Sequence, residues 1–98
     1  MRARLRPDAR AEYLAAFMWY EQQRAGLGQE FEREFEALLR AISESPQRFA
    51  PFDHEIRKGR LKRFPHFVYF AELPARVEVI ALVHCKRNPA WILKRVRG

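Results

Sequence analysis

The spacing of the apolar residues changes near Pro51, and this change limits what the chain can fold into. Before Pro51, apolar side chains recur every three or four residues, which is the repeat of an amphipathic helix. After Pro51 they come in short runs rich in Val, Ile and Phe, which are typical of β-strands. A helical first half joined to a sheet-forming second half predicts an α+β fold.

Two helices are predicted in the first half. The first runs from about Asp8 to Arg24, directly after Pro7, a residue favoured at the first position of a helix. The second runs from about Gln29 to Ser45, where Pro46 ends it, and its apolar stripe contains Phe31, Phe35, Leu38, Leu39 and Ile42. The short link Gly26-Leu27-Gly28 indicates that the two helices form an antiparallel hairpin.

The second half predicts a three-stranded antiparallel meander. Its strands are 56–64, 67–73 and 77–83, and the short turns between them favour antiparallel neighbours. A short strand at 3–6 precedes the helices, and a short helical tail follows Pro89. We expect the helices to be segregated to one face of the sheet.

In the last predicted strand, every second residue is a small or β-branched apolar residue. Val77, Val79, Ala81 and Val83 occupy these positions, so we expect them to share one side of the strand.

Size and composition predict a single domain over residues 1–98. With 48% hydrophobic residues, the 98-residue chain can fill one core. No apolar run is long enough to span a membrane, and the basic N-terminus leads into no apolar signal segment. Cys85 is the only cysteine, which excludes an internal disulfide and fits a cytoplasmic location. Its apolar surroundings favour a small buried hydrophobe over a nucleophile.

The net charge of +7 lies entirely in the second half. Residues 1–49 contain eight Arg and eight acidic residues, whereas residues 50–98 contain eleven Lys or Arg and four acidic residues. We expect the cations to converge on one surface that binds an acidic or phosphate-bearing partner. The alternative is a solvated sheet edge guarded by lysines. The cations concerned are Arg57, Lys58, Arg60, Lys62, Arg63, Lys86, Arg87, Lys94, Arg95 and Arg97.

The three histidines show no spacing typical of metal ligands, so no metal or other cofactor is expected. His54 lies in a polar loop, while His66 and His84 lie at strand ends. His66 and His84 could act as a general acid or base, although an ordinary hydrogen bond is the simpler role.

The remaining candidates for a functional role are three aromatic residues. We expect Trp19 and Tyr20 to lie in the core or at the contact between helix and sheet. Trp91 could stack on a base, bind a partner peptide or anchor the tail, and anchoring is favoured because Trp is mostly buried in proteins.

The order of several short motifs resembles the ParE/RelE superfamily, the toxins of type II toxin–antitoxin systems. The motifs are Pro7-Asp8-Ala9-Arg10-Ala11-Glu12, Trp19-Tyr20-Glu21-Gln22-Gln23, Gly26-Leu27-Gly28, Phe31, Ser45-Pro46, Arg48-Phe49, Arg63-Phe64-Pro65-His66, Val68-Tyr69-Phe70, Val79 to His84, Lys86-Arg87-Asn88-Pro89 and Trp91. The resemblance covers nearly the whole chain. It implies a bacterial toxin that a cognate antitoxin wraps and neutralises.

The superfamily divides into two mechanisms, and the sequence favours one. RelE-like members cut mRNA on the ribosome without a metal, and the resemblance places Arg60, Lys62, Arg63 and Arg87 around the phosphate, with His66 where those nucleases have an arginine. Such nucleases also keep a Tyr or His near the C-terminus for proton transfer, whereas this chain has Trp91-Ile92-Leu93-Lys94.

The missing proton carrier and the hairpin motifs favour a ParE-like inhibitor of DNA gyrase over an enzyme. A RelE-like ribosome-dependent endoribonuclease is the alternative, with His84 as its proton carrier. A third option is a nucleic-acid-binding or degenerate module without toxicity. We also expect an antitoxin partner, because the sheet and hairpin are predicted to expose more aromatic surface than so small a domain can cover.

Overall fold

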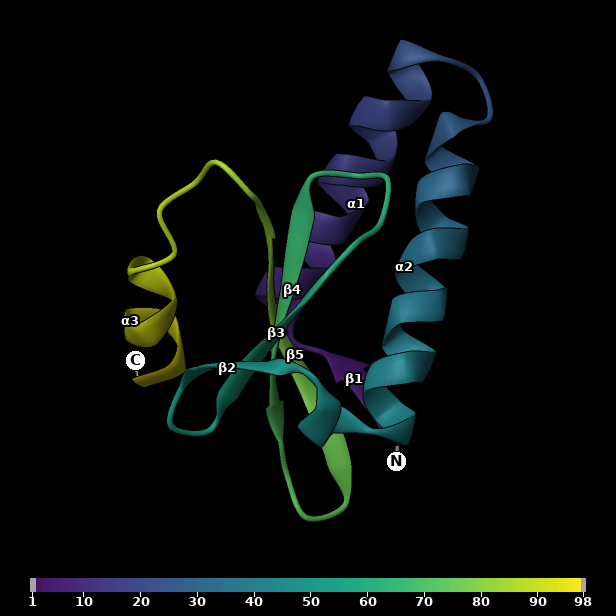
Figure 1. Cartoon of the computed structure of the whole chain (residues 1–98). Coiled ribbons are helices and arrows are strands. Elements are labelled where there is room, and N and C mark those ends of the chain that lie inside the picture. Colours follow the sequence, from purple (N-terminus) through teal and green to yellow (C-terminus); the bar gives the residue numbers. More distant parts are fainter. Residues whose placement is uncertain (1, 98) are drawn as a thin grey trace.

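The computed structural model describes residues 2–97 and contains a five-stranded sheet with helices on both faces (Figure 1). The elements are β1 (Arg2–Leu5), α1 (Pro7–Gln23), α2 (Leu27–Glu44), a 3₁₀ turn (Pro46–Arg48), β2 (Ala50–Asp53), β3 (Ile56–Arg60), β4 (His66–Glu72), β5 (Arg76–His84) and α3 (Trp91–Arg97). The strand order is β1-β5-β4-β3-β2, and β1 runs parallel to β5 while the other neighbours are antiparallel. The α+β class, the hairpin and the terminal helix are confirmed. The sheet is mixed and larger than the predicted meander, because β2 and β1 extend it on either side.

The turn between the two helices depends on two glycines and one carboxylate. Gly26 has a φ of 90°, a left-handed conformation that favours glycine. The Glu21 carboxylate accepts hydrogen bonds from the backbone N–H groups of Gly26 and Gly28, both at 2.9 Å. Gly28 also lies so close to α1 that a Cβ atom would be 2.9 Å from the Phe17 carbonyl oxygen. The turn therefore ends earlier than predicted, and α2 starts at Leu27.

The main core lies between the hairpin and one face of the sheet. It contains Phe31, Phe35, Ile42, Val68, Phe70, Val77, Val79 and Leu82, all of which are buried. Tyr13 of α1 packs on Phe35 with ring centroids 4.6 Å apart. Its hydroxyl donates a hydrogen bond to Glu32 of α2. Burial, together with the charge of Glu32, raises the pKa of Tyr13 to about 12.

A second core lies on the opposite face of the sheet, beneath α3. It contains Ile56, Tyr69, Ile80, Ala81, Val83 and Ile92. Figure 1 shows α3 on one side of the sheet and the α1–α2 hairpin on the other. The expectation that helices cover a single face is therefore wrong for the chain as a whole, because the terminal helix buries the apolar residues that point away from the hairpin.

A β-bulge at Ile80 explains how β5 supplies both cores. Tyr69 pairs with Ala81 and Phe70 pairs with Val79, so Ile80 is an extra residue without a partner in β4. The extra residue shifts the alternation of side chains by one position. As a result, Val77 and Val79 pack under the hairpin, whereas Ala81 and Val83 pack under α3. The prediction that these four share one side is wrong, because regular alternation does not continue through the bulge.

Helix α1 does not follow the predicted burial of its aromatic residues. Tyr20 is buried, but Trp19 is 57% exposed. Consecutive helical residues point about 100° apart, so two neighbours rarely share one buried face. The expectation that Trp19 lies in the core or against the sheet is therefore wrong.

The edge of β5 beyond β1 is closed by side chains. Strand β1 pairs with β5 as far as Val79. Past that point the Leu82 N–H donates to Oε1 of Glu12 at 3.0 Å, and Nη1 of Arg95 donates to the Ile80 carbonyl at 3.1 Å. Arg95 also holds both oxygens of Glu12, at 3.0 and 2.9 Å. This pair joins α1, β5 and α3.

Replacing Arg95→Met should lower the free energy of unfolding by about 2–3 kcal/mol, because it leaves the largely buried Glu12 carboxylate without its counter-ion and Ile80 without its donor. Urea titration followed by circular dichroism measures this. Lys94→Met is the matched control: Lys94 is exposed on the same helix, and its loss should cost less than about 0.5 kcal/mol. Equal stability of the two variants would contradict the role of the pair.

Candidate functional site

Several of the predicted site residues meet at one end of the sheet, which we call the basic loop end. It consists of Arg60, Lys62, His66, His84, Lys86 and Arg87. Strand β3 ends there and β4 begins there, and the pairing of His66 with His84 places the end of β5 beside them. A hydrogen bond of 2.8 Å from Cys85 N to the Pro65 carbonyl ties the two loops together. Figure 1 shows the β3–β4 and β5–α3 loops at the same end as the α1–α2 turn.

Ion pairs separate the ten predicted cations into two groups. Arg63 binds Glu30 and Glu34, Arg95 binds Asp8 and Glu12, and Arg97 lies 3.9 Å from Asp53. Within residues 2–97, the other seven form no ion pair with an acidic side chain: Arg57, Lys58, Arg60, Lys62, Lys86, Arg87 and Lys94. The ten cations therefore do not converge on one surface, because three of them hold elements of the fold together.

The unpaired cations also differ in where they lie. Arg60 and Lys62 are exposed in or beside the β3–β4 loop, and the Arg60 guanidinium donates to the Leu61 carbonyl at 2.7 Å. Arg57, in the middle of β3, donates to the Phe49 carbonyl at 2.8 Å. Lys58 lies 4.7 Å above the Phe67 ring. Lys94 is exposed on α3, away from the loops.

Arg63 fastens the β3–β4 loop to the hairpin. Its backbone N–H and Nε donate to the two carboxylate oxygens of Glu34 at 2.7 and 3.1 Å, and Nη1 reaches Glu30 at 3.3 Å. Burial by itself raises the pKa of Glu34, but the hydrogen bonds from Arg63 outweigh it and lower that pKa. Arg63 therefore positions the loop that carries Lys62 and His66.

His66 is held in an aromatic pocket and is uncharged at neutral pH. Its Nε2 lies 3.0 Å from the Tyr20 hydroxyl, and its ring packs edge-on against Phe31 and Tyr20. Its Nδ1 is buried without a hydrogen-bond partner among the described residues. Burial, with a smaller effect from His84, lowers the pKa of His66 to about 4.

His84 is the histidine that faces solvent at this end. Its ring centroid lies 5.4 Å from that of His66, and its Nδ1 accepts a hydrogen bond from the Lys86 backbone N–H at 3.1 Å. That bond leaves the proton of the neutral ring on Nε2. His84 is therefore oriented by the backbone while its other nitrogen is open to a ligand.

Trp91 and Cys85 lie next to these residues along the chain. Trp91 packs against the second core as a half-buried anchor of α3, and the guanidinium groups of Arg87 and Arg95 lie 4.3 and 4.5 Å from its ring. Cys85 is half-buried. Its environment is therefore less closed than the fully buried position that the sequence favoured.

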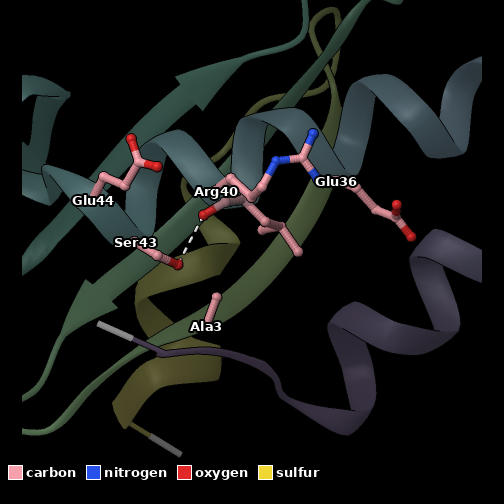
Figure 2. Close-up of a pocket in the computed structure, with 6 residues that line it drawn as sticks. Ala3, Glu36, Arg40, Ser43 and Glu44 are labelled. Atoms are coloured by element: carbon pink, nitrogen blue, oxygen red, sulfur yellow. Dashed lines mark hydrogen bonds between the residues drawn. The ribbon is translucent and has the colours of Figure 1, made fainter.

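Hollows lie on more than one side of α2. A cleft of about 490 Å³ between α2 and β3 has Glu34, Arg60 and Lys62 as its charged lining, and its apolar lining is Ala37, Leu38, Ala41, Phe49 and Leu61. Figure 2 shows a more open hollow between β1 and α2, where Ser43 lies over Ala3 while the charged ends of Arg40 and Glu44 point away from it. The cleft borders the basic loop end, whereas the hollow in Figure 2 does not include any of its residues.

Residues 2–97 contain neither a cluster of metal-ligating side chains nor a helix able to span a membrane. No group of three or more His, Cys, Asp or Glu side chains could hold a metal ion there. None of the described helices has the length and hydropathy needed to cross a membrane.

The prediction that Tyr20 lies in the core or at the contact between helix and sheet is confirmed. Its position seven residues after Tyr13, on the apolar side of α1, is the signal for that placement. Two contacts that organise the site and its support were not predicted: Tyr20 lies against His66, and Glu12 accepts hydrogen bonds from Arg95. Nothing in the spacing of Glu12 distinguishes it from a solvated helix carboxylate.

Acid should destabilise the fold through His66. The unfolded chain takes up a proton near pH 6.5, while His66 in the folded chain does so only near pH 4. The stability from neutral His66 is thus complete above about pH 6.5 and is lost as the pH falls toward 4. Between pH 7 and 4.5 this should cost about 1–2 kcal/mol after allowance for partial exposure.

The variant His66→Gln should lose correspondingly less stability than the wild type over this pH interval, as measured by urea unfolding at both pH values. His54→Gln is the control, since the His54 side chain is 87% exposed. An identical pH-dependent loss in wild type and His66→Gln would contradict this assignment.

Comparison with known proteins identifies the fold. No protein-family model matches the chain, and no curated protein sequence matches it. Among solved structures, it is similar to a chain described as "Chromosomal ParDE TA system from P. aeruginosa", with a TM-score of 0.76 and 12% identity. The match covers 88% of this chain and 97% of that chain. The α+β architecture described above is therefore the fold of that protein.

Proposed function

We propose that this chain is the toxin of a type II toxin–antitoxin pair, that it acts in the cytoplasm by inhibiting DNA gyrase, and that a cognate antitoxin neutralises it. The observation that carries the proposal is the fold shared with a chain of a ParDE TA system over nearly its whole length. The 12% sequence identity to that chain does not identify a target. The choice of target therefore rests on the site.

The motifs that resemble ParE in the sequence are in contact in the structure. In the Trp19–Gln23 motif, the Tyr20 ring packs against Phe64 of the Arg63–His66 motif with ring centroids 4.8 Å apart, and its hydroxyl lies 3.0 Å from Nε2 of His66. Arg63 of the Arg63–His66 motif binds Glu30 and Glu34 of α2. The two motifs thus form one unit that fixes the basic loop end on the hairpin, which supports reading them together.

The C-terminal segment supports a binding role over a catalytic one. The resemblance to nucleases requires a Tyr or His in this segment, but Trp91 anchors α3 and Ile92 is buried in the second core. Charge stabilisation without a proton carrier in that segment suits binding to a partner better than cleavage of RNA.

The cleft between α2 and β3 suits an antitoxin segment. Its apolar lining would accept large apolar side chains, and Arg60 and Lys62 in its charged lining would attract acidic ones. An acidic, amphipathic segment fits both properties. The exposed aromatic surface from which a partner was expected is small: Trp19 of α1 is exposed, whereas α3 covers the second sheet face. The support for an antitoxin therefore comes from the cleft.

Adding the purified chain to gyrase at micromolar concentration should inhibit supercoiling of relaxed plasmid. The double variant Arg60→Glu/Lys62→Glu should need at least about tenfold more protein, because it reverses two unpaired charges at the basic loop end. Arg33→Glu, which changes an exposed charge on α2, should inhibit as well as the wild type. Full supercoiling in the presence of the wild-type chain would contradict gyrase as the target.

A ribosome-dependent endoribonuclease is the second candidate, and one observation favours it. The solvent-facing ring of His84 lies beside the neutral His66 at the end of the sheet that carries Arg60, Lys62, Lys86 and Arg87. A histidine so placed is within reach of a bound phosphate as a general acid or base, while the cations stabilise a phosphorane.

Codon-resolved cleavage of ribosome-bound message tests this candidate. His84→Gln should reduce cleavage at least about 100-fold, and His54→Gln should leave it unchanged. Absence of cleavage by the wild type would exclude the candidate. Normal growth on induction without antitoxin would contradict both candidates and support a module without toxicity.

A further inference from the structure

The outer face of α1 carries an uncharged stripe, which we call the α1 stripe. Its residues are Ala11, Leu14, Ala15, Met18, Trp19 and Gln22. All six are exposed, and each follows the previous one after either three residues or one residue along the chain. This spacing places them on a single side of the helix. From Ala11 to Gln22, α1 therefore has no charged side chain on this side.

The α1 stripe is separate from the cores of the molecule. The opposite side of α1 is already occupied: Ala9 and Tyr20 are buried, and Tyr13 and Phe17 pack against the main core. In contrast, Leu14, Met18 and Trp19 are 45%, 59% and 57% exposed. Single exposed apolar residues are common on proteins, but a contiguous stripe marks an interaction surface.

We propose that the α1 stripe docks on the same stripe of a second copy of this chain, with the two helices antiparallel about a two-fold axis. A two-fold contact requires a self-complementary surface. An axis passing between residues 16 and 17 places Leu14 opposite Trp19 and Ala15 opposite Met18. The same axis places Ala11 opposite Gln22. Each small side chain thus faces a larger one, which lets two helices approach closely.

Charges beside the stripe fit this arrangement. Arg10 and Glu21 flank the same edge of the stripe near its two ends, so the antiparallel pairing brings Arg10 of each copy toward Glu21 of the other. Arg10 is exposed and forms no ion pair within residues 2–97. Glu21 is held in place by its hydrogen bonds to Gly26 and Gly28.

The distribution of net charge also permits self-association through α1. All seven surplus positive charges lie in residues 50–98, whereas residues 1–49 are balanced. Two copies that meet through α1 therefore join their neutral halves, and the Coulomb repulsion between their basic halves acts at longer range, where salt screens it.

The contact is small, which sets the strength of the dimer. One helical stripe from each copy buries less than the roughly 1,200 Å² at the lower limit of standard interfaces. We therefore expect a dimer that forms reversibly between about 10 and 500 µM rather than an obligate one.

Sedimentation equilibrium of the purified chain over that concentration range tests the association. The wild type should shift from monomer to dimer. Met18→Glu places a charge at the centre of the stripe and should weaken association at least about tenfold, while circular dichroism confirms that this exposed position keeps its fold. Arg33→Glu, on the outer side of α2, should dimerise as the wild type does. A wild type that stays monomeric at 500 µM, or a Met18→Glu variant that dimerises normally, would overturn the proposal.

Cysteine cross-linking tests the antiparallel geometry in a Cys85→Ser background. Two copies of Ala15→Cys would lie about 4.5 Å apart along the helix axis and should form a disulfide on oxidation. Two copies of Ala11→Cys would be offset by about 16 Å and should not. Cross-linking of both variants would indicate parallel helices, and cross-linking of neither would indicate that another molecule covers the stripe. Either outcome would overturn the proposal.

Discussion

The contact between Glu12 and Arg95 closes the edge of β5 that β1 leaves open. Glu12 accepts a hydrogen bond from the Leu82 N–H and Arg95 donates one to the Ile80 carbonyl, so two side chains take the place of a missing strand. Because Glu12 belongs to α1 and Arg95 to α3, the same contact fixes the two helix layers relative to the sheet between them. The basic loop end depends on this arrangement, since it is formed where β5 leaves the sheet.

Local spacing predicted much of this fold. The amphipathic stripe of α2, the glycine turn and the apolar runs of β4 and β5 each contain their own signal within a short window. What the sequence did not reveal requires information from distant partners. β2 contains Pro51 and only four residues, so it shows no strand pattern. The short strand predicted at 3–6 is present as β1, but its parallel pairing with β5 could not be predicted from its own residues. The bulge at Ile80 is visible only once β5 is aligned with β4.

The candidate site shows the same division between local and distant information. Counting charges located a basic half, and the loop positions of Arg60, Lys62, Lys86 and Arg87 bring part of it together. The sequence could not show that Arg63 and Arg95 are neutralised, because their acidic partners come from the two hairpin helices. The distinction between His66 and His84 is likewise tertiary: Tyr20 and Phe31 enclose the first, whereas the second remains open to solvent.

The extra residue in β5 has a consequence for how this strand can change over evolution. The segments before and after Ile80 are one step out of phase, so odd-numbered residues face the hairpin before Ile80 and face α3 after it. The segment after Ile80 contacts both layers, because Leu82 packs in the main core while Ala81 and Val83 pack in the second core. Loss of the residue at position 80 would make Val79 and Ala81 consecutive, and regular alternation would then leave each remaining side chain on its present face. The cost of that loss would be the Ile80 side chain itself, which the second core would no longer contain. The bulge therefore adds volume to the second core without turning over any other side chain of β5.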